Sequence, residues 1–180
     1  MNEPAPRPGS SRNPAIEIDR ITGRRIRSSH GVTSEPANAA PRSVFSWPVR
    51  VYYEDTDAGG IVYYANYLRF FERARTEWLR SLGGPSHFEM ARVRDEVFVV
   101  RGMRIEYHRP ARLDDMLELE LAVVESRRAS IVLRQWARRQ GDDEVLADAE
   151  VRIAMIRRSD GRPVGLPDWL TQSMQPGTAR

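Results

Sequence analysis

Four segments of alternating apolar and polar residues follow one another between residues 97 and 155, and this succession constrains the fold more than any other feature of the chain. Apolar residues at every second position are typical of strands that bury one face. The links at residues 127–129 and 141–143 are short enough for hairpins, so the pattern predicts an antiparallel sheet. The repeating positions are Val97, Val99, Met103, Ile105 and Tyr107; Leu117, Leu119, Leu121 and Val123; Ile131, Leu133 and Ala137; and Val145, Ala147, Ala149, Val151, Ile153 and Met155.

One helix pattern precedes these strands. Its apolar residues recur three or four positions apart and so form one stripe; they are Tyr67, Phe71, Ala74, Trp78 and Leu82. Asn66 is the predicted N-cap, because its amide oxygen can accept from first-turn N–H groups. Residues 44–54 predict a preceding strand, residues 86–95 a second short helix or a loop, and residues 167–174 a short C-terminal turn. The expected fold is α+β, an antiparallel sheet wrapped around one long helix.

Three acidic residues lie where the first strand meets the helix pattern. Glu54, Asp55 and Asp57 stand between two aromatic, apolar blocks, and two glycines follow them. Acidic side chains are rarely buried without a partner, and the N–H groups of a helix N-terminus attract developing negative charge. A carboxylate beside such donors supplies a nucleophile or base together with an oxyanion site. That combination is what acyl transfer requires.

Two long motifs in this region carry a family resemblance. The first is W-P-V-R-V-Y-Y-E-D-T-D-A-G-G from Trp47, and the second is F-E-R-A-R-T-E-W-L-R ending at Arg80. They resemble the hotdog-fold acyl-CoA thioesterases of the 4-hydroxybenzoyl-CoA thioesterase type, and within that group the branch encoded beside the Tol-Pal envelope system. The resemblance continues through residues 98–101 and 106–117 and covers roughly residues 43–167. It implies the hotdog fold, hydrolysis of acyl-CoA thioesters without cofactor or metal, and a homodimer or homotetramer joined through sheet edges.

The resemblance also implies roles for individual residues of the acidic turn. Asp57 precedes the Ala-Gly pair, where the family places its functional carboxylate, and it could act as a nucleophile or as a general base. Glu54 and Asp55 are expected to cap the turn. Gly59 and Gly60 allow positive φ and close approach of the substrate to the backbone.

Four further residues are implied for substrate contact. Tyr64 stands where the family uses a backbone N–H to polarise the thioester oxygen; many relatives in the Tol-Pal branch carry His here. Tyr67 is expected in the core, with a possible role in acyl contact. Arg127 and Arg128 match a basic turn that holds the CoA nucleotide in the 4-hydroxybenzoyl branch, because arginine suits phosphates. The alternatives for that contact are Arg157, Arg158 and Arg162.

Composition narrows the classes of site and partner. The chain has no cysteine and three histidines, so thiol chemistry is excluded and a transition-metal site is not expected. The formal net charge is +3; residues 1–43 hold seven of the 28 basic residues and four of the 25 acids, which leaves 21 of each in the remainder. A neutral folded part does not favour nucleic-acid binding. No apolar run reaches the roughly 20 residues that span a bilayer, so a cytoplasmic protein is expected, with peripheral inner-membrane association as an alternative.

The expected domain organisation has three parts. Residues 1–43 are rich in Pro, Ser, Gly and Arg and are predicted to be a disordered extension, although an over-long start or a short partner-binding motif remains open. Residues 44–170 are predicted to fold, and residues 171–180 to fray.

The alternative function is a non-catalytic hotdog protein that binds acyl groups or acyl carrier protein, or that scaffolds lipid enzymes at the inner membrane face. Asp57 favours hydrolysis, and Tyr64 in place of His leaves the alternative open. A dehydratase is disfavoured, since no H-F-P motif is present.

Overall fold

The computed structural model describes residues 45–174, and the predicted extension at residues 1–43 lies outside them. The elements are β1 (Phe45–Arg50), a short 3-10 helix η1 (Tyr53–Asp55), α1 (Asn66–Ser81), α2 (His87–Val93), β2 (Glu96–Tyr107), β3 (Met116–Arg127), β4 (Ser130–Arg139), β5 (Val145–Arg157) and α3 (Asp168–Ser173). No helix within residues 45–174 is long and apolar enough to cross a membrane.

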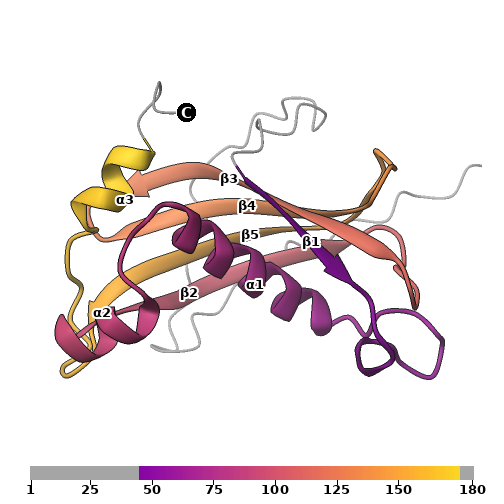
Figure 1. Cartoon of the computed structure of the whole chain (residues 1–180), viewed down its shortest axis with the longest axis horizontal. Coiled ribbons are helices and arrows are strands. Elements are labelled where there is room, and N and C mark those ends of the chain that lie inside the picture. Colours follow the sequence, from indigo (N-terminus) through magenta and orange to yellow (C-terminus); the bar gives the residue numbers. More distant parts are fainter. Residues whose placement is uncertain (1–44, 175–180) are drawn as a thin grey trace, which may run out of the picture. The chain divides into compact units, whose positions relative to one another are not determined.

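The five strands form one antiparallel sheet in the order β1-β3-β4-β5-β2. Helix α1 lies along one face of it, and α2 and α3 lie at one end (Figure 1). Side chains of α1 and of the facing strands make up the core; the fully buried ones include Phe70, Phe71, Leu119, Leu121 and Leu133. The predicted antiparallel sheet and its hairpins are confirmed, and two short helices accompany the long one.

The predicted capping role of Asn66 is wrong. Ala65 is the N-cap, and the Asn66 backbone N–H already donates to the carbonyl of Tyr63 at 2.8 Å. The Asn66 side chain is buried, and its Nδ2 donates to the carbonyl oxygen of Asp55 at 2.9 Å. This amide therefore connects the start of α1 to the acidic segment instead of satisfying the helix itself.

The first strand is shorter than predicted, because the chain turns before residue 54. β1 ends at Arg50, and η1 follows it. The buried carboxylate of Asp55 accepts a hydrogen bond from the backbone N–H of Tyr52 at 2.9 Å, which closes this turn. A side chain that takes the place of a strand partner in this way ends strand geometry.

Strand β2 contains a bulge that the period-two pattern does not show. Phe98 is opposite Met155 and Val100 is opposite Ile153, but the register then shifts so that Met103 is opposite Val151. One additional residue reverses the alternation of side chains. Phe98 therefore shares the core face with Met103, and the prediction that Val97 and Val99 do so is wrong.

The two edges of the sheet are β1 and β2, while β5 lies between β4 and β2. The apolar last strand is thus interior, and β2 offers the longer edge. At one end of the sheet, α3 continues the folded chain beyond residue 170, the predicted end of the domain, and buries Leu170 completely. The ring of Trp169 lies so close to Gly84 that a Cβ there would come within 2.7 Å of it, so this glycine permits α3 to pack.

Candidate active site

Asp57 begins a tight turn before α1. Its backbone N–H donates to the carbonyl of Ile61 at 2.9 Å, and its own carbonyl accepts from Gly60 N–H at 2.9 Å. Gly60 has φ of 71°, a conformation that favours glycine. A Cβ on Gly59 would lie 3.0 Å from Asp57 Oδ1, so this glycine leaves room for the carboxylate.

The Asp57 carboxylate is held and yet accessible. The side chain is exposed, and Oδ1 accepts from the backbone N–H of Gly59 at 2.8 Å. Oδ2 has no hydrogen-bond partner within residues 45–174. One oxygen therefore fixes the orientation of the group, and the other is free to reach a reacting atom or a water molecule.

The turn is attached to the rest of the fold through the segment that precedes it. The carbonyl of Asp55 accepts from Tyr63 N–H at 2.8 Å as well as from Asn66 Nδ2. Val62 N–H donates to the carbonyl of Ala111 at 2.9 Å. The predicted capping role is confirmed for Asp55, whose side chain accepts from Tyr52 N–H. It is wrong for Glu54, whose side chain is exposed and makes no hydrogen bond within residues 45–174.

Tyr64 lies between the turn and the first residue of α1. Its backbone N–H makes no hydrogen bond within the described part of the chain, while its carbonyl accepts from the hydroxyl of Tyr107 at 3.0 Å. The free N–H stands near the positive end of the helix dipole, where a developing oxyanion is stabilised. The ring is exposed and lies against Tyr63 and Tyr107, with centroid distances of 4.6 and 6.3 Å.

Tyr67 lies in the core, as predicted. It is 3% exposed, and its hydroxyl accepts from the backbone N–H of Ala111 at 3.2 Å. Burial raises the pKa of this phenol. The Tyr67 hydroxyl thus anchors the loop that follows β2.

The arginine pair lies at the other end of the sheet. Arg127 ends β3 and pairs with Glu125, and the carbonyl of Arg128 accepts from Leu166 N–H at 2.8 Å. β3 starts at Met116 near the Asp57 end and has 12 residues; at about 3.3 Å per residue it separates the two ends by roughly 36 Å. Within one chain, the structure does not bring this pair to Asp57 (Figure 1).

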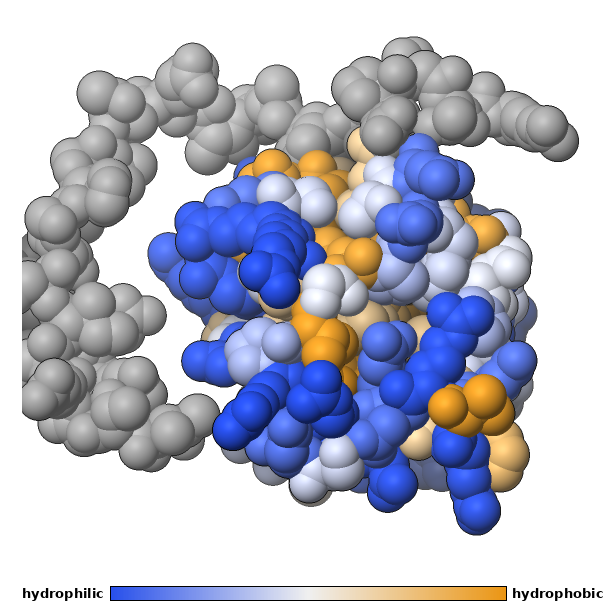
Figure 2. Space-filling view, turned by 90° about the vertical axis from the view of Figure 1, so that its left-hand side faces the viewer, coloured by the Kyte–Doolittle hydropathy of each residue, from blue (hydrophilic) through white to orange (hydrophobic). Residues whose placement is uncertain are grey.

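The end of the molecule that carries the arginine pair is largely hydrophilic. Figure 2 shows this side, with a few smaller apolar areas among the hydrophilic residues. The alternative phosphate contacts lie near the end of β5 and are already engaged with carboxylates. Arg157 and Arg162 pair with Asp160, and Arg158 pairs with Asp95.

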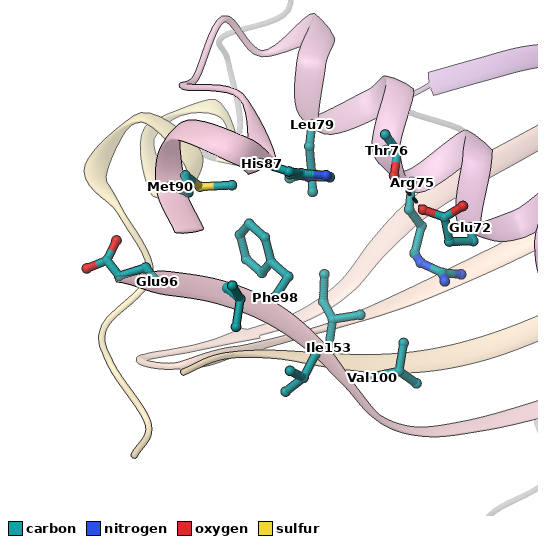
Figure 3. A pocket seen from close by; sticks show the side chains of 12 residues that line it. Glu72, Arg75, Thr76, Leu79, His87, Met90, Glu96, Phe98, Val100 and Ile153 are labelled. Carbon is teal, nitrogen blue, oxygen red and sulfur yellow. Dashed lines mark hydrogen bonds between the residues drawn. The ribbon is translucent and has the colours of Figure 1, made fainter. Parts of the chain in front are cut away.

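A pocket of about 250 Å³ between α1, α2 and β2 escaped the sequence analysis (Figure 3). Its walls are apolar except for a few charged or polar side chains. Glu72, Arg75, Thr76 and Leu79 come from α1; His87 and Met90 from α2; Glu96, Val97, Phe98, Val99 and Val100 from β2; and Ile153 from β5. The spacing of the α1 residues by three or four is the signal that could have placed them on one helix face.

A protein-built metal site is not found in the described residues, since no group of three His, Cys, Asp or Glu side chains could hold an ion there. The chemistry available at the turn is that of a carboxylate, a free backbone N–H and exposed phenols. These groups can supply a base or nucleophile and an oxyanion donor.

Sequence comparison relates this chain to known thioesterases. Residues 59–146 match the Thioesterase superfamily. The acyl-CoA thioester hydrolase YbgC of Escherichia coli O6:H1 is 46% identical over 127 residues, which are 69% of this chain and 91% of that protein. The acyl-CoA thioesterase YbgC of Haemophilus influenzae is 45% identical over 126 residues, 68% of this chain and 88% of that protein.

A solved structure shows the same relationship in three dimensions. A probable thioesterase from Bartonella henselae has a TM-score of 0.63 and 37% sequence identity, covering 68% of this chain and 98% of that one. The five-stranded sheet against α1 agrees with this similarity. The chain belongs to the thioesterase superfamily and has its hotdog fold.

Proposed function

We propose that this protein hydrolyses acyl-CoA thioesters to a free acid and CoA. Asp57 acts as nucleophile or general base, and the Tyr64 backbone N–H polarises the thioester carbonyl. The observation that carries this proposal is the accessible Asp57 carboxylate in a turn that hydrogen bonds tie to the start of α1. The names of the relatives described above support the choice of substrate.

Either route uses the same groups. As a nucleophile, Asp57 Oδ2 attacks the thioester carbon, the carbonyl oxygen takes the negative charge facing Tyr64 N–H, CoA leaves as the thiolate, and water hydrolyses the resulting anhydride. As a base, Asp57 takes a proton from water, which attacks the same carbon. Neither route needs a metal or an organic cofactor, so turnover should persist in EDTA.

The direct test measures thiol release from short aliphatic, long aliphatic and aromatic acyl-CoAs. Hydrolysis of part of this panel supports the proposal. Binding of acyl-CoA or of acyl carrier protein with no thiol release across the whole panel would favour the non-catalytic alternative.

The resemblance to the Tol-Pal branch supports a place in envelope lipid metabolism, with the protein cytoplasmic or peripheral at the inner membrane.

The edge of β2 that has no strand partner within residues 45–174 supports a two-fold dimer. Exposed edges invite pairing, and two-fold dimers are the commonest symmetric assemblies. In an antiparallel pair, the start of one β2 lies beside the end of the other. β2 starts at the pocket and ends at Tyr107, whose hydroxyl donates a hydrogen bond to the carbonyl of Tyr64. The dimer would therefore place the Asp57 end of one subunit beside the pocket of its partner.

The same arrangement accounts for the distant arginine pair. Since the two subunits run in opposite directions, the hairpin with Arg127 and Arg128 of one subunit moves toward the Asp57 end of the other. The two guanidinium groups are then placed to meet CoA phosphates there. Gly59 and Gly60 give the thioester close access to the turn, and Tyr67 supports the site from the core.

We expect light scattering to find a homodimer or homotetramer, and Gly102→Asp to shift it toward monomer with loss of hydrolysis. Gly102 lies near the middle of β2, and its Cβ position meets no atom within 4 Å, so the variant should fold. In a two-fold pair, two added carboxylates would lie close together and repel. Gly102→Ala is the matched control and should remain assembled. A fully active monomer of the unaltered protein would rule out this assembly.

Tyr64→Phe should leave kcat/KM within a few-fold of the parent. The proposed contact with the thioester is made by the backbone N–H, which every residue except proline provides. The carbonyl that accepts from Tyr107 is also unchanged. Steady-state kinetics check this expectation; a drop of tenfold or more would show that the phenol itself takes part.

A further inference from the structure

Arg75 is a buried cation with few partners. It is 7% exposed, and its Nη1 donates to Oε1 of Gln135 at 2.7 Å. Gln135 is fully buried and donates from Nε2 to the carbonyl of Phe71 at 3.0 Å. Within residues 45–174, Arg75 forms no ion pair with a carboxylate and no other side-chain hydrogen bond. A guanidinium has five N–H donors, so most of them are unused.

Arg75 is one of the residues that line the pocket. Trp169 Nε1 is the one side-chain nitrogen or oxygen in the described residues that is sealed from solvent without a partner. The other Arg75 nitrogens are therefore in contact with accessible space, and Arg75 lines the pocket between α1, α2 and β2. Burying an unpaired charge is costly, and burial lowers the pKa of this guanidinium. An acceptor on a bound ligand would remove that cost.

The pocket has an apolar part and a polar end. Leu79, Met90, Phe98, Val100 and Ile153 form the apolar part, and Glu72, Arg75 and Thr76 gather at the end nearer the middle of α1 (Figure 3). The Thr76 hydroxyl donates to Glu72 Oε1 at 2.8 Å. At about 250 Å³ the space lies below the roughly 300–1,000 Å³ of pockets that enclose drug-sized ligands. It suits an acyl group rather than a whole acyl-CoA.

The charges at the polar end select the kind of acceptor. The Glu72 carboxylate attracts the Arg75 guanidinium. This attraction opposes part of the lowering of the Arg75 pKa that burial causes. Glu72 lines the same end of the pocket as Arg75, so a carboxylate on a ligand would be repelled by Glu72 while Arg75 attracts it. A neutral oxygen can accept from Arg75 without adding charge, and a hydroxyl can also donate to Glu72.

We propose that Arg75 is a specificity-determining residue that selects acyl groups carrying a hydroxyl or keto oxygen on an otherwise apolar chain. This proposal rests on the hydrolysis of acyl-CoA proposed above and on the two-fold dimer, which brings the Asp57 end of one subunit beside the pocket of its partner. The competing explanation is purely structural: Arg75 and Gln135 join α1 to β4, and the pocket takes any apolar chain.

The test compares kcat/KM for pairs of acyl-CoAs that differ by one oxygen: saturated chains of several lengths beside their hydroxy and keto analogues. A hydrogen bond to a charged donor discriminates by about tenfold to a hundredfold. We expect the parent to prefer one oxygenated series by that factor and Arg75→Met to abolish the preference. Gln135→Met leaves the guanidinium facing the pocket and should retain the preference.

Further measurements separate the possible failures. Arg75→Lys keeps the charge but not the planar fork; it should fold if Arg75→Met does not, and its preference should be reduced. Thioether analogues of each pair, which cannot be hydrolysed, report binding without turnover. Equal binding and equal hydrolysis of both series by the parent would overturn the role of Arg75 alone, as would a lower melting temperature of Arg75→Met with an unchanged ranking. Selective binding of the oxygenated thioethers without any hydrolysis would instead overturn the proposed function and leave the role of Arg75 standing.

Discussion

Asp57→Asn is expected to lower kcat/KM for acyl-CoA hydrolysis by at least about 100-fold, the usual effect of removing a general base or nucleophile. Asparagine keeps the volume of the side chain. Its amide oxygen can still accept from Gly59 N–H, the contact that orients the carboxylate at 2.8 Å. The turn should therefore keep its shape, while the oxygen that would attack or take a proton is replaced by an amide NH₂. Steady-state assays of thiol release measure the loss of kcat/KM.

A matched control lies three residues earlier. Glu54 is exposed, belongs to the same acidic segment and has no proposed role in the reaction, so Glu54→Gln should stay within a few-fold of the parent. Both variants should keep the parent's circular dichroism spectrum and melting temperature, because neither carboxylate is buried. Activity of Asp57→Asn within a few-fold of the parent would refute the assignment of Asp57.

Phe70→Ala is expected to reduce the free energy of unfolding by about 3–5 kcal/mol, the typical cost of truncating a buried phenylalanine. Phe70 is fully buried on the first turns of α1, and its ring lies 6.0 Å from that of Tyr67. The total free energy of unfolding of a domain is about 5–15 kcal/mol, so this substitution removes a large share of the stability. It also loosens the helix whose start carries the proposed oxyanion site. Urea denaturation followed by circular dichroism measures the effect.

Arg69→Ala is the control for that experiment. Arg69 is exposed on the same turn of α1, and exposed substitutions commonly change stability by less than about 0.5 kcal/mol. A loss below about 1 kcal/mol for Phe70→Ala would show that the core can collapse around the missing ring. It would also show that α1 is held mainly by other contacts.

The strands from β3 to β5 could be predicted from the sequence, because their apolar residues follow the pleat directly. Leu117, Leu119 and Leu121 are all fully buried, and the links to β4 and β5 are short. Strand β2 could be recognised as a strand, but the sequence did not show which of its side chains face the core before the bulge. Its bulge depends on how Val100 and the following residues pair with β5, which is a contact with a distant segment.

The start of the helix shows a similar limit. Asparagine is one of the residue types that are favoured at helix N-caps, so local propensity favours that role for Asn66. In the structure its amide instead satisfies the carbonyl of Asp55, since both groups are buried in the same place. A buried polar group takes the partner that the fold brings to it, and that partner is 11 residues away.

By itself, the sequence determined the elements whose patterns are local: the antiparallel strands, the long helix and the glycine turn that presents Asp57. Only the tertiary structure decided which of the expected site residues meet. It placed Asp57 and Tyr64 at one end of the sheet and Arg127 and Arg128 at the other, because an antiparallel strand carries its two ends apart. It also formed the pocket that Arg75 lines, since that space exists only where α1, α2 and β2 come together.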